Sequence, residues 1–556
     1  MTICVQCSTG FEVTDADRAF YDKVSPVFNG QKYAIPEPTH CPDCRLQRKI
    51  AWRNERCLYK QTCGKCKKWI VSVHSNDATY PVYCNHCWWG DGWNAHDYGR
   101  DVDFSRPFFD QVRELMDVVP QLAMQNDDGV TSVNCQYCQD FAFGKNCYFV
   151  IGTWYTQDSF YSSIDSSYNR DVCDCTHVYK SELAYESIDS EGLYNCIGLQ
   201  NSEGCRDCAF GFDLKGCRDC FACVGLRQKQ YYIFNQPHTA EEYRKKIESF
   251  PLGSYHNFKQ SCARYLEWVL RFPRKNMNLK NCQDSVGDHL FNCKNTFGFS
   301  LLNAEEAKWC YQGDQNRFSY DIFNSGRPNW CYEGLTPDDS YLTHFSWFSW
   351  KNKYVLYGIN CHTSEHLFGC VSLHRSKYCI LNKQYSKEKY EQMVGQIVGH
   401  MVERGEWGEF MPIQHSFFHY NDTVAQEYFP VTKEVARSRG WKWKDANSKE
   451  YAPQHYVISE AIQDVPDTVM NELLACTQCG KNYKIIAQEL AFYRKMNIPI
   501  PRECPDCRHR ARLKLRTAYK LYSCACAKCS APIQTTYSPD RPEIVYCEQC
   551  YLKEVY

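Results

Sequence analysis

The chain has 556 residues and a formal net charge of −1, and 44% of its residues are apolar. This length allows about three to five domains, and the balanced charge excludes a global field that would attract nucleic acid or a membrane surface. No apolar run reaches about 18 residues, so we expect no membrane span. The first residues, MTICVQCSTG, lack the basic and apolar regions of a secretion signal. We therefore expect a cytoplasmic protein whose 37 cysteines are metal-bound or buried thiols, not disulfides.

The two ends of the chain, residues 1–100 and 471–556, each carry four CxxC pairs. From the second pair on, the pairs repeat with a constant offset (504 − 41 = 463). The first pairs differ by more (476 − 4 = 472), so the N-terminal copy has a nine-residue insertion between Tyr21 and His40. The paired cysteines are Cys4, Cys7, Cys41, Cys44, Cys63, Cys66, Cys84, Cys87, Cys476, Cys479, Cys504, Cys507, Cys526, Cys529, Cys547 and Cys550.

This spacing predicts two double-zinc modules. A CxxC pair places two thiolates on one tight turn, and two such turns complete a tetrahedron around Zn²⁺. Eight ligands per module give about four zinc ions in the chain, all structural because closed Cys₄ sites leave no position for a water. We favour sequential pairing of the CxxC motifs, because each CPDCR pair opens a polar helical stretch; a cross-brace stays as the alternative. Cys57 and Cys524 have no counterparts, so we expect no metal at them.

The pattern C-x-x-C … FY … CPDCR resembles a family of treble-clef zinc-binding domains. The segments YNDTVAQEYFPVTKE and AFYRKMNIPIPRECPDCR resemble those of cysteine-rich proteins of uncultured bacteria. This resemblance covers most of the chain. It implies a fold and zinc binding, and it implies no activity.

A basic stripe follows each CPDC motif at the helical spacing i, i+4, i+8. The functional hypothesis is that these side chains contact the phosphates of RNA or DNA. The alternative, which we favour, is a solvated face that offsets the charge of the zinc sites. The stripes are Arg45, Lys49 and Arg53 in the first module and Arg508, Arg512 and Arg516 in the second.

After a linker helix expected in 101–131, the middle of the chain is also duplicated. CVGLRQKQYYIFNQPHTAEEY, from Cys223, matches CVSLHRSKYCILNKQYSKEKY, from Cys370, and the offset is 147 (370 − 223). NCQ at Asn134 and at Asn281 repeats with the same offset. We therefore expect two tandem halves, 132–280 and 281–404.

Each half has a shorter period of 12 residues, which predicts a β-solenoid with two short strands in each rung. Two columns of small or apolar residues define the rungs. The first column is Phe160, Val172, Ala184, Cys196, Cys208 and Cys220, repeated as Ala307, Ser319, Cys331, Thr343, Val355 and Leu367. The second is Ile164, Thr176, Ile188, Gln200, Phe212 and Val224, repeated as Tyr311, Phe323, Leu335, Trp347, Ile359 and Val371.

Most central cysteines fit an inward column, because Cys is small and behaves as a hydrophobe. One cluster has the spacing CxxC-x₈-CxxC and consists of Cys205, Cys208, Cys217 and Cys220. We favour the interpretation that these are stacked core thiols, and a fifth zinc site is the alternative. The 12-spaced Asp207 and Asp219 each follow an arginine, which predicts ion pairs at turns.

Helices should cover the open ends of the solenoids, since exposed strand edges invite pairing with other chains. Thr239 and Glu242 form a capping box before TAEEYRKKIESF, and a second helix, SYHNFKQSCARYLEWVL, should follow. Ser386 is the equivalent N-cap in the second half. Residues 405–470 read as a connector of short helices and loops.

No nucleophile elbow, phosphate loop, dinucleotide fingerprint or HExxH motif is present. Histidines in the second half lack ligand spacing, and we expect them at the surface; they are His289, His344, His362, His366 and His374. We therefore expect no enzyme, and predict a mixed, mainly β scaffold that binds a protein partner. The second hypothesis is a nucleic-acid-binding protein, and the third is an unrecognised enzyme on the solenoid. We expect no membrane partner, and the sequence does not specify an oligomeric state.

Overall fold

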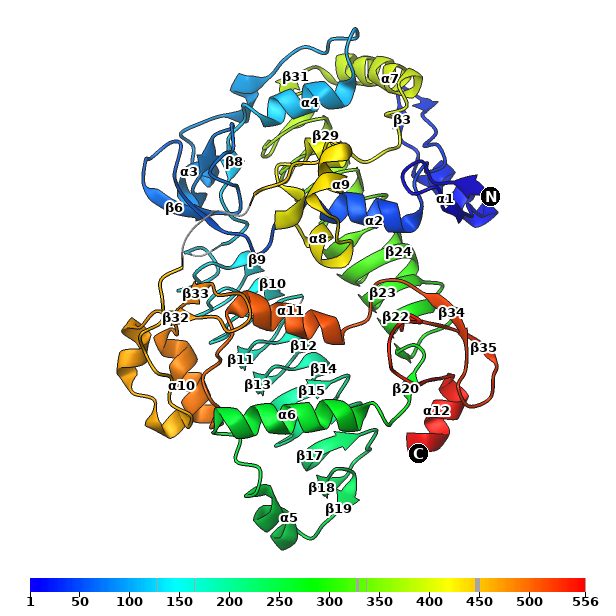
Figure 1. Ribbon diagram of the computed structural model, residues 1–556. Helices are drawn as coiled ribbons and strands as arrows, with labels where there is room; N and C mark the ends of the chain where they lie inside the picture. The colour runs from blue at the N-terminus through cyan, green and yellow to red at the C-terminus, as the bar shows by residue number, and fades with distance from the viewer. Residues whose placement is uncertain (128, 165, 327–329, 337, 446–450, 556) are drawn as a thin grey trace. The chain divides into compact units, whose positions relative to one another are not determined.

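The structure is a computed structural model that describes all residues except 128, 165, 327–329, 337, 446–450 and 556. The fold is mainly β with some helices, as predicted, and a β-solenoid runs over residues 139–380 (Figure 1). The chain divides into two compact units, each built from two separate segments. Unit 1 comprises 1–124 and 278–445, and unit 2 comprises 125–277 and 446–556. Each terminal module therefore belongs with the half of the solenoid that is farther from it in sequence.

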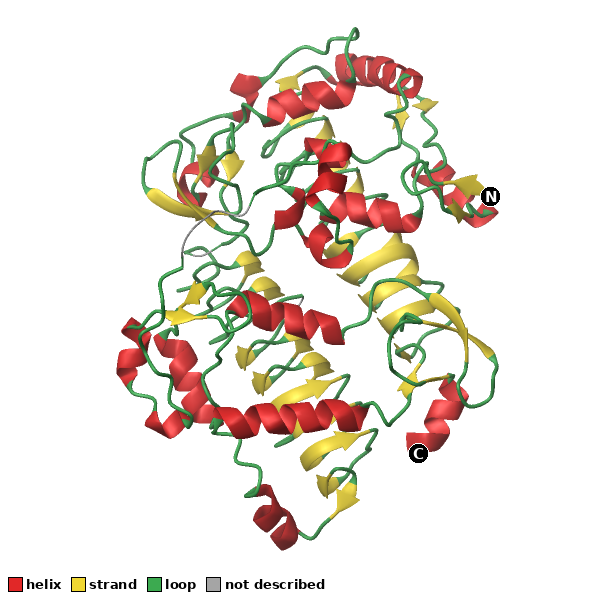
Figure 2. Cartoon of the chain, viewed as in Figure 1, coloured by secondary structure: helices red, strands yellow, loops and turns green. Residues whose placement is uncertain are grey.

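In unit 2 the solenoid coils are joined by parallel strand pairs, mostly with an offset of 12 residues: Ala184 pairs with Cys196, and Gly211 with Cys223. Figure 2 shows the strands as stacked yellow arrows. They are β9 (Gln139–Ala142), β10 (Ile151–Trp154), β11 (Arg170–Cys173), β12 (Thr176–Tyr179), β13 (Glu182–Tyr185), β14 (Ile188–Glu191), β15 (Tyr194–Gln200), β16 (Ala209–Phe212), β17 (Arg218–Val224) and β18 (Gln230–Ile233).

In unit 1 the first coils are one residue shorter. Leu279 pairs with Leu290, an offset of 11, whereas Ala307 pairs with Ser319, an offset of 12. The register changes at an irregularity between Phe297 and Gly298. The strands are β21 (Leu279–Lys280), β22 (Val286–Phe291), β23 (Phe297–Leu302), β24 (Glu305–Asp314), β25 (Arg317–Tyr320), β26 (Phe323–Gly326), β27 (Tyr341–His344), β28 (Lys353–Leu356), β29 (Glu365–Phe368) and β30 (Lys377–Ile380).

Within a coil the backbone repeats every three residues. In the coil 195–206, left-handed φ angles of 52° to 61° occur at Asn195, Gly198, Asn201 and Gly204. The residue after each of them points into the coil, so Cys196, Leu199, Ser202 and Cys205 are at most 2% exposed. Asn and Gly suit these positions because they tolerate the left-handed region better than other residues. A 12-residue coil therefore has four sides of three residues. The predicted two short strands per rung are present in several coils, for example β11 with β12 and β13 with β14.

The two predicted columns have different environments. The first lies inside the coils: Ala184 and Cys196 are fully buried and pack with other interior side chains. The second is not interior, because Phe212 instead joins a cluster with the C-terminal helices. In unit 1, the indole N–H of Trp347 donates to the main-chain oxygen of Trp52 at 2.7 Å. The second column is therefore apolar because a terminal module packs on it.

One prediction of register is also wrong. Phe160 pairs with Cys173, an offset of 13, so it does not belong to the column of Val172. Ser163 pairs with Thr176 in the same way, which displaces Ile164 from the second column. The coil between these residues has one additional residue, and a strict period of 12 does not reveal it.

Helices follow the last coil of each half, as expected. Helix α5 (Ala240–Ile247) contacts β18, and α6 (Tyr255–Val269) contacts β16 and β17. Helix α7 (Lys387–Glu403) contacts β30. The capping box of Thr239 and Glu242 is confirmed, since each side chain accepts the other's main-chain N–H. Ser386 caps α7 through a bond from the N–H of Lys389 at 3.2 Å. Short antiparallel strands complete the ends of the two sheets, β19 (Gln236–Pro237) and β31 (Lys383–Gln384).

The remaining elements form the terminal modules and connectors. Those of the N-terminal segment are β1 (Thr2–Ile3), β2 (Gly10–Phe11), α1 (Asp15–Val24), β3 (Val27–Phe28), β4 (Gln31–Lys32), α2 (Pro42–Ile50), β5 (Tyr59–Thr62), β6 (Trp69–Ser72), β7 (Val82–Tyr83), α3 (Asn85–Trp89), α4 (Phe108–Met116) and β8 (Gln121–Leu122). Those of the C-terminal segment are β32 (Leu474–Ala475), β33 (Asn482–Tyr483), α10 (Ala487–Met496), α11 (Pro505–Leu515), β34 (Tyr522–Ala525), β35 (Pro532–Thr535), β36 (Val545–Tyr546), which pairs with β20 (Arg274–Lys275), and α12 (Glu548–Val555).

The nine-residue insertion of the N-terminal copy contains the β3–β4 hairpin, which contacts α7. Helix α4 lies in the segment 101–131 that was expected to hold a linker helix. The connector contains short 3₁₀ turns and two short helices, α8 (Val424–Tyr428) and α9 (Lys433–Ser438). Among the described helices, none is long and apolar enough to cross a bilayer.

Candidate metal centres

The sixteen paired cysteines form four groups of four sulfur atoms. Within each group all Sγ atoms lie within 4.8 Å of one another, which suits one ion at the centre. The groups join the first CxxC pair of a module with the second, and the third with the fourth; the arrangement is sequential and not cross-braced. They are Cys4, Cys7, Cys41 and Cys44; Cys63, Cys66, Cys84 and Cys87; Cys476, Cys479, Cys504 and Cys507; and Cys526, Cys529, Cys547 and Cys550.

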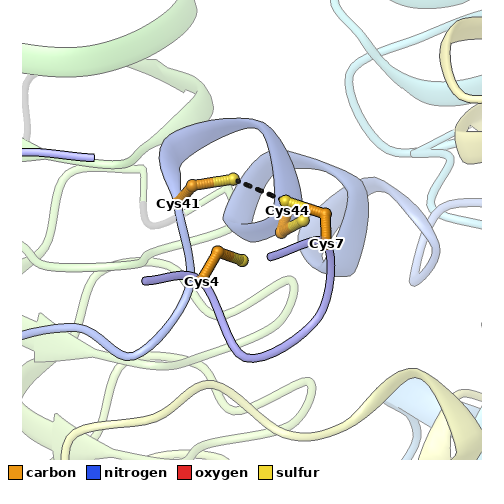
Figure 3. A group of neighbouring side chains, drawn as sticks. All are labelled: Cys4, Cys7, Cys41 and Cys44. Carbon is orange, nitrogen blue, oxygen red and sulfur yellow. Dashed lines mark hydrogen bonds between the residues drawn. The ribbon is translucent and has the colours of Figure 1, made fainter. Parts of the chain in front are cut away.

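The first group of each module joins a hairpin to a helix start. Cys4 and Cys7 lie in the turn between β1 and β2, and Cys41 is the N-cap of α2. Pro42 follows at the first position of the helix, where the missing N–H costs nothing. Figure 3 shows the four side chains converging, with Cys7 and Cys41 Sγ 3.6 Å apart. The C-terminal copy repeats this arrangement with the β32–β33 hairpin and α11.

The second group of each module has the same plan. Cys63 and Cys66 lie in the turn between β5 and β6, and Cys84 is the N-cap of α3. Cys66 and Cys84 Sγ are 3.9 Å apart. In the C-terminal copy, the β34–β35 hairpin and the start of α12 hold the four sulfurs. All four groups therefore place two cysteines at a helix N-terminus, where the helix dipole favours thiolates.

Main-chain N–H groups further stabilise a thiolate at the first cysteine of three groups. The N–H of Cys84 points to Cys63 Sγ at 3.4 Å, and that of Cys547 to Cys526 Sγ at 3.2 Å. Burial raises the pKa of both thiols, but these and neighbouring N–H groups outweigh it and lower the pKa of each to about 6. Cys476 accepts an equivalent N–H at 3.2 Å, and its pKa is about 7 for the same reason. In each of these three groups, a metal ion would meet one ligand that loses its proton readily near neutral pH.

The interior cluster has a different geometry. Cys205 donates to the main-chain oxygen of Leu214 at 3.4 Å, and Cys208 to that of Cys217 at 3.7 Å. These sulfurs are at most 2% exposed, and each acts as a thiol donor to the next coil. Across the described residues, the compact four-sulfur geometry occurs in the four terminal groups and not in this cluster; Cys57 and Cys524 also lie outside those groups.

The six side chains predicted as phosphate contacts are buried. None of them is more than 8% exposed, so the stripes are neither a nucleic-acid surface nor a solvated face in this structure. They lie where the helices α2 and α11 pack on the solenoid coils. Their positions are Arg45, Lys49 and Arg53 on or after α2 and Arg508, Arg512 and Arg516 on or after α11.

In unit 1, the basic side chains of α2 meet a buried carboxylate of the solenoid. Arg45 Nη2 lies 3.0 Å from an oxygen of Asp321, and Lys49 Nζ lies 3.5 Å from the other. Lys49 also donates to the main-chain oxygen of Asp321. The side chains of all three residues are at most 2% exposed, so removal of one partner would leave an uncompensated buried charge.

Unit 2 contains the same contact. Arg508 Nη1 lies 3.2 Å from an oxygen of Asp174, and Arg512 Nη1 lies 2.7 Å from the other. The basic residues follow their unit 1 counterparts by 463 positions, and Asp321 follows Asp174 by 147 (321 − 174). The two duplications therefore describe one repeated unit, a module docked on a solenoid.

Sequence reasoning missed these carboxylates. Asp174 and Asp321 carried a signal, because they are acidic in both copies of a repeat whose surroundings are small or apolar. Asp207 and Asp219 fulfil the prediction made for them, since Arg206 and Arg218 lie 3.3 and 3.4 Å from the carboxylate that follows each.

The expectation of surface histidines is wrong for two of the five. His344 is 1% exposed and His362 is 2% exposed. His362 lies 3.1 Å from the side-chain oxygen of Asn360, and its ring is 5.7 Å from that of Trp88. Aromatic side chains of the terminal module cover His362, and the sequence pattern of the solenoid does not show this.

Comparisons with known proteins add no family. No protein-family model matches the chain, and no curated protein matches it. Among solved structures, one described as an acetyltransferase from Desulfovibrio desulfuricans G20 is 10% identical, with a TM-score of 0.10. The match covers 44% of this chain and 60% of that chain, so the chain spans less than two thirds of its length. A likeness this weak carries no argument about fold or activity.

Proposed function

We propose that the chain is a non-catalytic scaffold in which four structural zinc ions hold two treble-clef-like double-zinc modules, each docked on one of two tandem solenoids. The observation that carries this proposal is the set of four sulfur groups, each complete with four thiols. A tetrahedral S₄ set suits zinc or iron, and four protein ligands leave no open position for substrate or water. A hairpin turn followed by a ligand pair at a helix start supports the treble-clef assignment.

Elemental analysis of the purified protein tests the metal. We expect about four zinc ions per chain, because each group supplies one complete ligand set. The variant Cys44→Ser should lose about one ion, whereas Cys57→Ser and Cys524→Ser should retain all four. Two ions or fewer in the parent protein would refute the double-zinc module, and iron in place of zinc would refute the metal assignment. A fifth ion would point to the cluster of Cys205 and Cys220.

We further propose that the scaffold binds a protein partner in a reducing compartment such as the cytoplasm. Stacked aromatic side chains on the solenoid support this, because aromatic residues are enriched at interfaces. Phe143 stacks on Tyr155 at 4.7 Å, and Tyr155 on Tyr168 at 5.0 Å between ring centroids. The three are 45, 47 and 56% exposed.

Affinity capture from the native cell, with and without nuclease, tests the partner. Recovery of one protein that survives nuclease and is lost when Tyr155 is replaced by Ser supports the proposal. Recovery that disappears on nuclease treatment contradicts it. Burial of the six basic side chains keeps them from a phosphate backbone, so the basic helices do not support nucleic-acid binding.

A further inference from the structure

The β5–β6 hairpin of unit 1 presents an exposed tryptophan among lysines. Trp69 is 71% exposed, although an indole is large and usually well buried. Lys60 Nζ lies 5.1 Å from the centre of its ring, which is cation–π distance. Lys67 and Lys68 are exposed in the metal-binding turn that precedes Trp69. The hairpin and its turn therefore carry an exposed aromatic ring and three exposed cationic side chains.

Within the described part of the chain, these lysines have no carboxylate partners. Among the residues that the structure describes, no ion pair joins Lys60, Lys67 or Lys68 to an acidic side chain; Lys67 instead donates to the main-chain oxygen of Gly64 at 2.7 Å. Residues 56–76 contain four lysines, one arginine and no acidic residue. The net charge of −1 for the whole chain does not reveal this local positive charge.

The C-terminal module provides an internal comparison. Its β34–β35 hairpin has the same register, since Ala525 pairs with Pro532 as Thr62 pairs with Trp69. The turn also matches in backbone, with φ angles of 62° at Lys67 and 61° at Ser530. The side chains differ.

In that copy, the positions of Lys60, Lys67, Lys68 and Trp69 are occupied by Ser523, Ser530, Ala531 and Pro532. The shared lysine, Lys528, contacts Glu554 in an ion pair. The same four-thiol group therefore forms without the additional lysines, so neutralising a bound metal does not explain them. An exposed tryptophan is not needed for the hairpin either.

We propose that the β5–β6 hairpin binds single-stranded nucleic acid, a partner that goes beyond the scaffold function. The Trp69 indole would stack on an unpaired base, and Lys60, Lys67 and Lys68 would contact the flanking phosphates. A single strand suits this surface because its bases can leave the stack and expose their faces, whereas a duplex covers them. Stacking tolerates any base, so we expect little sequence preference.

Fluorescence anisotropy with the zinc-loaded full-length protein and a labelled 20-nucleotide oligo(dT) or oligo(U) tests the proposal across a salt series. The variant Lys60→Gln/Lys67→Gln/Lys68→Gln should weaken binding at least about tenfold and reduce the slope of log K against log[salt] by about 2, because three phosphate contacts are lost. Trp69→Ala should weaken binding about fivefold or more with little change of slope, since stacking releases no counterions.

A matched control removes three basic side chains elsewhere. Arg244→Gln/Lys245→Gln/Lys246→Gln on α5 should leave affinity within about twofold. The reverse change, Ser523→Lys/Ser530→Lys/Ala531→Lys/Pro532→Trp, should raise affinity by creating a second copy of the surface. Zinc content has to remain equal across the variants, which separates failure of this surface from failure of the metal assignment.

Three results would overturn the proposal. One is the absence of salt-dependent binding to either oligonucleotide. Another is tighter binding to a duplex of the same length. The third is stronger binding to phosphatidylserine vesicles than to the oligonucleotides, with loss on the same lysine substitutions, which would identify an anionic membrane surface as the partner.

Discussion

In unit 1 and unit 2 the terminal module packs on the solenoid through one contact that both units share, and through other ion pairs that differ between them. In both, an arginine in the first turn of the CPDC helix meets a buried solenoid aspartate, at 3.0 Å for Arg45 and 3.2 Å for Arg508. A tyrosine pair accompanies it, Tyr21 with Tyr332 in unit 1. The counterpart in unit 2 is the pair of Tyr493 and Tyr185. This central contact is the feature that the two duplications share.

At the edges, each unit has an ion pair that the other lacks. In unit 1, Arg48 lies 2.8 Å from Glu333 and 2.6 Å from Glu409. Although burial opposes it, Arg48 helps to hold the pKa of the Glu409 carboxyl well below its ordinary value. The position equivalent to Arg48 in unit 2 is Ala511.

In unit 2, Arg516 instead lies 2.9 Å from Asp189, whose counterpart in unit 1 is Thr336. The solenoid carboxylate Glu333 has an acidic counterpart in unit 2, Glu186, so it does not distinguish the two solenoids. A C-terminal module docked on the solenoid of unit 1 would, however, bury Arg516 opposite Thr336. Burying an unpaired charge is costly, so the contact of Arg516 with Asp189 favours the correct pairing. The difference teaches that the shared contact supplies docking, and the contact of Arg516 with Asp189 supplies specificity.

The largest expected effect comes from removing the shared carboxylate. Asp321→Ala should destabilise unit 1 by about 3–5 kcal/mol, because Arg45 and Lys49 stay buried without a partner. Urea unfolding followed by tryptophan fluorescence measures this, since two tryptophans, Trp154 and Trp268, lie in unit 2 and the other 12 of 14 (14 − 2) lie in unit 1.

Asp174→Ala should cause the equivalent loss in unit 2, measured by proteolysis of that unit in urea. The control Glu365→Ala removes a half-exposed surface pair with Lys377 and should cost about 0–1 kcal/mol. Equal effects of Asp321→Ala and Glu365→Ala would show that the shared contact does not secure docking.

A smaller expected effect is a pH dependence of the free energy of unfolding that distinguishes unit 1 from unit 2. Burial lowers the pKa of His74 to about 3 and that of His344 to about 4, and both lie in unit 1. His362 and His374, in the same unit, also have lowered pKa values, and burial is the main cause in each. Their folded-state pKa lies below the unfolded value of 6.5, so the unfolded chain binds more protons as the pH falls.

Stability from these histidines is therefore fully present above pH 6.5 and is lost progressively below it. When the pH falls from 6.5 to 5.5, each of these histidines should lower the free energy of unfolding of unit 1 by about 1 kcal/mol. Urea midpoints by tryptophan fluorescence at the two pH values measure the loss, and His74→Gln should reduce the difference by about 1 kcal/mol. An unchanged midpoint for the parent protein would contradict the prediction.

The smallest effect concerns the matched helix caps. Thr239→Ala removes a complete capping box and should destabilise α5 by about 1 kcal/mol, whereas Ser386→Ala removes one bond at α7 and should cost somewhat less. Hydrogen exchange of each helix measures the difference. A larger loss at α7 than at α5 would reverse the expected order.

Much of the fold followed from the sequence because repeated positions carry the same physical role. The constant offset of the CxxC pairs predicted the sulfur groups, and the 12-residue period predicted a solenoid. The backbone conformation within each coil was harder to predict from the sequence. Its backbone turns at every third residue, and many turn positions hold bulky residues such as Leu183 and Phe210, which do not favour a left-handed φ.

The docking of the modules could not be predicted from one segment at a time. The spacing of Arg45 and Lys49 identifies a common helix face, but it does not identify what that face contacts. Their partner Asp321 lies 272 residues after Lys49, beyond the segment 125–277 that belongs to unit 2, and it belongs to another duplication. The offsets of 463 and 147 together would have connected the two, because both partners repeat.

The interleaved order of the segments has a consequence for synthesis. Lys49 and its acceptor Asp321 are 272 residues apart. At about 5–20 residues per second, a ribosome needs roughly 15 to 55 seconds to produce the second after the first. During this time helix α2 has emerged without its carboxylate, and its cationic side chains face water. The nascent chain therefore passes through a stage in which all cysteines of its first module have been synthesised, but the solenoid surface on which this module packs has not.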